Sequence, residues 1–99
     1  MTAYNVVRFK VKSGQDQAFL AAHKNFKPLP GMIEGGMIKA GEQTYCLIAK
    51  WESVDRIVAA RPQMIGVLDS FRHMLEDQGN GLGVTDAVSG SVVMDLQSA

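Results

Sequence analysis

Residues 43–57, QTYCLIAKWESVDRI, contain the end of one structural element and the start of the next. The first part alternates with a period of two, so Tyr45 and Trp51 share one face of a strand, although both faces carry apolar groups. Ser53 can then cap a helix with its side-chain oxygen, and Asp55 in the first turn favours the positive end of the helix dipole. This stretch therefore predicts a strand that leads directly into a helix.

Three further elements precede this stretch. Residues 4–12 alternate as a strand, and residues 16–27 repeat apolar groups at helical spacing until a proline-rich segment stops them. Residues 32–40 are rich in β-forming residues and are separated from the strand at 43–52 by a short polar link. This spacing is typical of a hairpin, so we expect these two strands to pair in antiparallel fashion.

The second half of the chain predicts helix and then strand. Pro62 removes a backbone donor and clashes with the preceding turn, so we expect the helix to break after Arg61 into two short helices or to kink sharply. Residues 84–96 read as a fourth strand, with a bulge or turn at Ser89 and Gly90.

The order of these elements predicts the fold. Strand, helix, strand, strand, helix, strand is the α+β, ferredoxin-like βαββαβ arrangement, in which a four-stranded antiparallel sheet carries both helices on one face. We expect residues 1–99 to form a single domain. The other sheet face carries apolar side chains, and a second copy related by two-fold symmetry would cover it, so we expect a homodimer.

The composition argues against several kinds of partner. Lys and Arg total 10 and Asp and Glu total 10, so no nucleic-acid partner is expected. No apolar run approaches the roughly 20 residues that span a bilayer, and the first residues lack a signal-peptide pattern, so we expect no membrane partner and a cytoplasmic location. One cysteine and two histidines form a thin set of metal ligands, and we expect no metal.

Two stretches of the sequence resemble a known family. VRFKVKSGQDQAFLAAH, residues 7–23, looks like the first strand and helix of the antibiotic biosynthesis monooxygenase-like proteins, and TYCLIAKWESVDRI, residues 44–57, resembles their third strand and the start of their second helix. The resemblance extends over nearly the whole chain, and the segments after residue 58 are similar to a bacterial subgroup of that family. It implies a dimeric α+β barrel with a pocket between each sheet and its helices.

The resemblance also implies an activity. Several members of this family are monooxygenases that use O2 on quinol-like or anthrone-like aromatic rings without a metal or a flavin, so the resemblance implies that no cofactor is needed. Such substrates react with O2 once they are deprotonated, so the protein supplies an apolar cavity, a proton acceptor and a hydrogen-bonding group for the developing oxyanion. Asn, Trp, Tyr, His and Arg serve in different members, so no compact motif marks the site.

Two polar residues on the helices are candidates for catalysis. A helix advances by about 100° per residue, so His23 lies about 40° from Phe19, near the apolar stripe of the first helix. Because an imidazole titrates near neutral pH, His23 is the candidate base. By the same count Arg72 borders the stripe marked by Leu68 and is a candidate oxyanion-binding group or anchor. His73 lies about 140° from Leu68, on the side that faces water.

Other residues are candidates for substrate binding, and each has a structural alternative. Arg72 can pair with an acidic residue three or four positions away, and His23 can simply be packed. Asn5 can cap a neighbouring loop and Trp51 can fill the core, while Arg61 can enter the cavity or pack at the dimer edge. The substrate-binding candidates are Asn5, Trp51, Arg61 and Met64.

Two alternatives to the monooxygenase remain. One is a non-catalytic homodimer that binds a small apolar metabolite or serves in a stress response. The other is haem degradation, because members of a second branch of relatives have an asparagine on the first strand and a histidine late in the second helix, like Asn5 and His73. Those proteins carry a tryptophan inside the second helix, whereas Trp51 precedes it, and Val7 falls where their asparagine usually stands.

Overall fold

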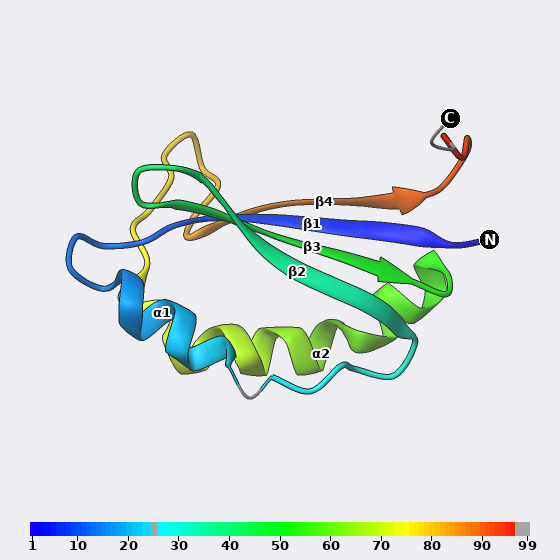
Figure 1. The fold of residues 1–99 in the computed structure, drawn as a ribbon, viewed down its shortest axis with the longest axis horizontal. Helices are drawn as coiled ribbons and strands as arrows, with labels where there is room; N and C mark the ends of the chain where they lie inside the picture. Colours follow the sequence, from blue (N-terminus) through cyan, green and yellow to red (C-terminus); the bar gives the residue numbers. More distant parts are fainter. Residues whose placement is uncertain (25, 97–99) are drawn as a thin grey trace.

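The computed structural model describes residues 1–24 and 26–96. It confirms the predicted α+β, ferredoxin-like order, with one additional short 3-10 turn after the second helix (Figure 1). The elements are β1 (Ala3–Lys10), α1 (Asp16–His23), β2 (Met32–Gly41), β3 (Thr44–Trp51), α2 (Val54–Phe71), the 3-10 turn η1 (Arg72–Met74) and β4 (Thr85–Ser91).

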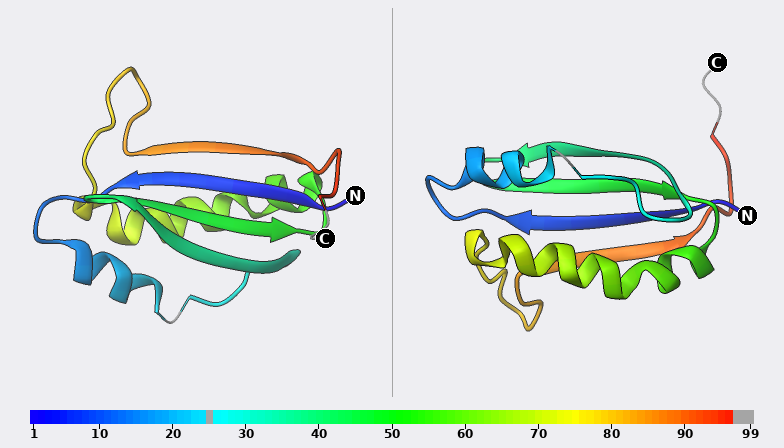
Figure 2. Two further views of the ribbon diagram at one scale, coloured as in Figure 1. Left: turned by 45° about the horizontal axis from the view of Figure 1, so that its top comes forward. Right: turned by 90° about the horizontal axis from the view of Figure 1, so that it is seen from below.

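The four strands form one antiparallel sheet in the order β2-β3-β1-β4. Both helices lie on the same face, and the opposite face is uncovered (Figures 1 and 2). In the register, Val7 of β1 lies opposite Leu47 of β3 and Ala87 of β4. Because side chains alternate along each strand, these three residues belong to one face of the sheet.

Of the two expectations at Pro62, two short helices or one sharply kinked helix, the first is wrong. The helix runs without interruption from Val54 to Phe71, with Pro62 inside it. Proline removes the bond to the carbonyl of Val58, but the Val58 side chain is 48% exposed, so this part of the helix faces water. Water can bind the freed carbonyl there, and the helix tolerates the proline. The predicted cap at Ser53 is confirmed, because its Oγ accepts the backbone N–H of Arg56 at 3.3 Å.

Two predicted element ends are also wrong. The first helix ends at His23, and residue 25, within the predicted span 16–27, lies outside the described residues. The fourth strand ends at Ser91, well before residue 96, because its last partner is Ala3, close to the start of β1. The pairing of β4 with β1 is also continuous, without the expected bulge.

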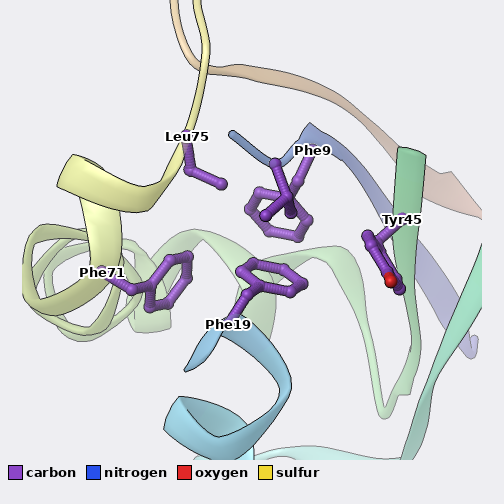
Figure 3. Packing of buried hydrophobic residues seen from close by; sticks show 6 residues of the cluster. Phe9, Phe19, Tyr45, Phe71 and Leu75 are labelled. Atoms are coloured by element: carbon purple, nitrogen blue, oxygen red, sulfur yellow. The ribbon is translucent and has the colours of Figure 1, made fainter. Parts of the chain in front are cut away.

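An aromatic cluster joins the helices to the sheet at one end. Phe19 of α1 lies between Phe71 and Tyr45, with Phe9 beside it (Figure 3). The Phe19 ring centroid is 5.4–5.5 Å from the other three, a separation typical of favourable aromatic pairs. A second buried cluster at the other end is built around Trp51 and consists of Ala3, Ala49, Trp51, Ile57 and Ala60.

None of the helices formed by residues 1–24 and 26–96 is long and apolar enough to cross a membrane.

Candidate functional site

A cavity of about 570 Å³ lies between the helix-facing side of the sheet and the two helices, extending from the aromatic cluster to the tryptophan cluster. Its volume falls within the range of ordinary small-molecule pockets. Five of the six predicted site residues line it: Asn5, His23, Trp51, Arg61 and Met64.

His23 occupies the last position of α1, at the aromatic end of the cavity. Its ring centroid lies 4.6 Å from that of Phe71 and 4.7 Å from that of Phe19. Its Nδ1 is 2.8 Å from the backbone carbonyl oxygen of Phe19. A carbonyl can only accept a hydrogen bond, so Nδ1 carries the hydrogen in the neutral ring and Nε2 keeps its lone pair. The backbone of α1 therefore fixes the tautomer that can accept a proton at Nε2.

Asn5 is a polar residue in the sheet wall of the cavity. It is only 6% exposed and lies on β1, next to Ala49 of β3 and Ser89 of β4. Its Nδ2 donates a long hydrogen bond of 3.8 Å to the sulfur of Met64 on α2. A thioether is a weak acceptor, so most of the bonding capacity of this amide is available to a ligand.

Trp51 forms the end wall near Asn5. The side chain is fully buried, and its Nε1 has no hydrogen-bond partner among residues 1–24 and 26–96. A buried N–H without a partner costs free energy and is uncommon in native proteins. Trp51 therefore fills both roles that the sequence offered as alternatives: it packs in the core and it forms part of the cavity wall.

Arg61 lies on the face of α2 that lines the cavity. The residues on that face follow helical spacing, from Ile57 through Arg61 to Met64 and Ile65. Arg61 is exposed, so it stands at the cavity mouth with its guanidinium accessible to water. Arg61 therefore lies at the cavity, which is one of the two positions considered for it from the sequence.

Arg72 does not line the cavity. Its guanidinium is half exposed and pairs with Asp69, with Nη2 2.9 Å from Oδ1. The angular count from Leu68 fails here because the α-helix ends at Phe71 and the chain continues as a 3-10 turn. The carboxylate pairing considered as the alternative for Arg72 is confirmed, and the structure does not place Arg72 with the other site residues.

His73, in the same 3-10 turn, is exposed, as predicted, and is also absent from the cavity wall. Asn5 and His73, which suggested a comparison with haem-degrading proteins, are therefore not brought together.

Some cavity residues were missed in the sequence. One group comes from the irregular segment between α1 and β2, which has no periodic pattern to reveal its position. The other group lies on β4, where alternate residues share a face, a signal that was available from the period of two. The missed residues include Phe26, Pro28, Leu29, Thr85, Ala87 and Ser89.

Tyr45, in the aromatic cluster, has a shifted pKa. The hydroxyl of Tyr45 donates a 2.7 Å hydrogen bond to Oδ2 of Asp16, at the start of α1. This hydrogen bond, together with burial and the negative charge of Asp16, raises the pKa of Tyr45. Tyr45 does not line the cavity, so the pair fastens α1 to β3.

The described part of the chain contains no group of three or more His, Cys, Asp or Glu side chains that could hold a metal ion.

Known structures share this arrangement, although no protein-family model and no curated protein matches the sequence. A candidate antibiotic biosynthesis monooxygenase from Chloroflexus aurantiacus superposes with a TM-score of 0.72 at 12% identity, covering 98% of both chains. The cofactor-independent oxygenase SnoaB from Streptomyces nogalater gives a TM-score of 0.68 at 16% identity, again covering 98% of both chains. The chain has the same fold as these two proteins.

A dimeric ferredoxin-like protein from an uncultured marine organism is also similar, with a TM-score of 0.73 at 10% identity over 99% of this chain and 93% of that one. These superpositions, at low sequence identity, show that the fold is shared, as the sequence resemblance predicted. One fold can host many activities, so the function has to be argued from the cavity of this chain.

Proposed function

We propose that this protein is a cofactor-independent monooxygenase that acts with O2 on a small quinol-like or anthrone-like aromatic. The observation that carries the proposal is the 2.8 Å contact between Nδ1 of His23 and the carbonyl oxygen of Phe19. Nδ1 is held by the Phe19 carbonyl, which leaves Nε2 as the proton acceptor beside an apolar cavity. The similarity of the fold to the cofactor-independent oxygenase SnoaB supports the same activity.

The proposed reaction begins with proton transfer from the substrate to Nε2 of His23. For an anthrone, the resulting anion gives an electron to O2, and the two radicals combine at the ring carbon to form a peroxide. Protonation gives a hydroperoxide, which loses its remaining C–H proton as the O–O bond breaks. The products are a ketone and water, so one oxygen atom enters the substrate and the other leaves as water. The substrate supplies all of the electrons.

The polar groups at the other end of the cavity have a separate role. The amide of Asn5 has unused donor capacity and can bind the substrate oxygen, which becomes more negative as the proton leaves. Apolar walls exclude water and so strengthen this hydrogen bond. Trp51 and Met64 would hold the ring system in place.

We also propose that the functional unit is a homodimer formed through the uncovered sheet face. Side chains that alternate with the cavity residues point to that face, and it carries exposed apolar groups: Tyr4 is 41% and Val88 is 68% exposed. The structurally similar marine protein is described as dimeric, and a second copy of this chain is the occupant that would bury such a face.

Oxygen consumption with a panel of quinols and anthrones tests the proposed activity. We expect at least one compound to consume O2 faster with the protein than without it, with one O2 used per ketone formed. If no compound in the panel reacts above the uncatalysed rate, the proposal is wrong. Retained binding of the same compounds would then favour the non-catalytic alternative.

A further inference from the structure

The charged groups around the cavity are unevenly distributed. Among the described residues that line it, within 1–24 and 26–96, there is no aspartate, no glutamate and no lysine, and Arg61 is the one side chain with a permanent charge. The other polar lining groups are the amide of Asn5, the ring of His23 and two hydroxyls on β4. With no acidic group to balance the guanidinium, the cavity has a net positive mouth.

Arg61 also differs from the other arginines of the chain. Arg8 pairs with Asp86, Arg56 with Glu52, and Arg72 with Asp69, at N···O distances of 3.3, 3.3 and 2.9 Å; these acidic partners are all outside the cavity wall. Within residues 1–24 and 26–96, Arg61 has neither an ion pair nor a side-chain hydrogen bond to another residue. The one arginine at the cavity is therefore the one left free for an external anion.

We propose that the ligand carries a carboxylate, which Arg61 binds at the cavity mouth while the aromatic body enters the cavity. A guanidinium presents two parallel N–H donors that match the two oxygens of a carboxylate. That the ligand is aromatic rests on the proposed function. The carboxylate is an additional feature of the ligand, which the proposed function alone does not require.

The positions of the residues also orient the ligand. Arg61 and Phe71 are ten residues apart, about 15 Å along α2, and His23 packs against Phe71. The anion-binding group and the proton acceptor therefore lie toward opposite ends of the cavity. Arg61 is one turn from Met64, which bonds to Asn5, so the carboxylate lies at the Asn5 end. The substrate is an elongated polycyclic aromatic acid whose reactive hydroxyl or methylene is distant from its carboxylate.

Isothermal titration calorimetry with two matched probes tests the carboxylate site. The probes are 2-naphthoate and its neutral isostere 2-naphthamide, each titrated into the full chain at pH 7.5 in low salt. We expect 2-naphthoate to bind at least tenfold more tightly, and its affinity to fall as salt increases. Equal affinities, or no measurable binding of 2-naphthoate, would overturn the proposal.

Variants assign the effect to one side chain. Arg61→Gln should abolish the preference for 2-naphthoate over 2-naphthamide, and Arg61→Lys should restore part of it. Arg72→Gln removes the same charge just beyond the C-terminal end of α2, outside the cavity, and should leave the preference unchanged. A preference that persists in Arg61→Gln would contradict the proposal. Both probes lack a reactive position, so their binding is independent of O2 uptake. If the protein prefers 2-naphthoate over 2-naphthamide but oxidises no substrate, only the proposed function is rejected.

Discussion

Gly31 is a residue at which the backbone and its packing both require glycine. Its φ is +90°, in the left-handed region, and an added Cβ would lie 2.6 Å from Cβ of Arg56. Gly14 has a similar φ of +83°, but nothing lies within 4 Å of an added Cβ there. The two positions share the backbone cost of a side chain and differ in the steric clash.

We therefore expect Gly31→Ala to be more destabilising than Gly14→Ala. The left-handed backbone should cost each variant about 1 kcal/mol, and the clash should cost Gly31→Ala about 1–3 kcal/mol more. Urea denaturation followed by circular dichroism measures both free energies of unfolding. Equal losses would mean that the segment before β2 shifts to accommodate the added methyl group.

The raised pKa of Tyr45 predicts how the stability of the protein changes with pH. Its folded-state pKa is raised, so its contribution to stability is fully present below the unfolded pKa of about 10 and is lost as pH rises through the folded pKa. We expect Tyr45→Phe to lower the midpoint of thermal unfolding at pH 7, because Asp16 loses its hydrogen-bond donor. The variant should also lose less stability than the wild type between pH 9 and pH 11.

Identical profiles for Tyr45→Phe and the wild type above pH 9 would show that the Tyr45 hydrogen bond does not stabilise the fold.

Several site residues could be predicted because they lie inside regular elements. The position of His23 follows from Phe19 one helical turn earlier, and that of Asn5 from alternation with Phe9. Arg72 could not be placed, because the sequence does not reveal that the α-helix changes to a 3-10 turn at that residue. The bond between His23 Nδ1 and the Phe19 carbonyl was also not anticipated, since it depends on the rotamer of the ring.

At the scale of elements, Pro62 makes α2 less stable than its sequence would otherwise allow. Proline costs about 3 kcal/mol relative to alanine inside a helix, and part of this is offset because it stiffens the unfolded chain. We expect Pro62→Ala to raise the free energy of unfolding by about 1–3 kcal/mol. Gln63→Ala, at the adjacent exposed position, should change it by less than about 0.5 kcal/mol.

Chemical denaturation of both variants provides the measurement for α2. A destabilised Pro62→Ala protein would mean that the ring of the proline makes a favourable contact or that the helix needs its local geometry.

The existence and order of the elements could be predicted, but several of their boundaries could not. Periodicity identifies a helix or strand, whereas its end depends on partners elsewhere in the fold. Strand β4 stops at Ser91 because β1 provides no long continuation opposite it, although residues 92–96 remain compatible with a strand in sequence. Helix α2 continues past Pro62 because its freed carbonyl faces water.

At the scale of the whole molecule, the uncovered sheet face tests the proposed dimer. We expect the wild type to have the mass of a dimer and Val88→Asp to be monomeric, because a buried carboxylate without a partner is costly. Val58→Asp makes the same change at an exposed position on α2 and should remain dimeric. Sedimentation equilibrium measures the masses, and a dimeric Val88→Asp would exclude this part of the sheet from the interface.

The overall fold was predictable for two reasons. The order of the six elements and the strands with apolar groups on both faces are compatible with only a small set of topologies. The cavity was less predictable, since part of its wall comes from the segment between α1 and β2. The positive mouth appears only when Arg61 is seen next to a wall without acidic groups. The pairing of Arg8 with Asp86, 78 positions apart, is likewise a product of the fold, whereas Arg56 and Arg72 pair with acidic residues four and three positions away, a spacing that the sequence shows.

O2 uptake by variants of the two histidines of the chain tests whether His23 is the proton acceptor. With a quinol or anthrone that the wild type oxidises, His23→Gln should lower the turnover rate by about 100-fold or more, because it removes the proton acceptor. His73→Gln, at the exposed position, should leave the rate unchanged. Binding of 2-naphthoate by both variants verifies that the cavity is intact. Wild-type turnover in His23→Gln would contradict the account.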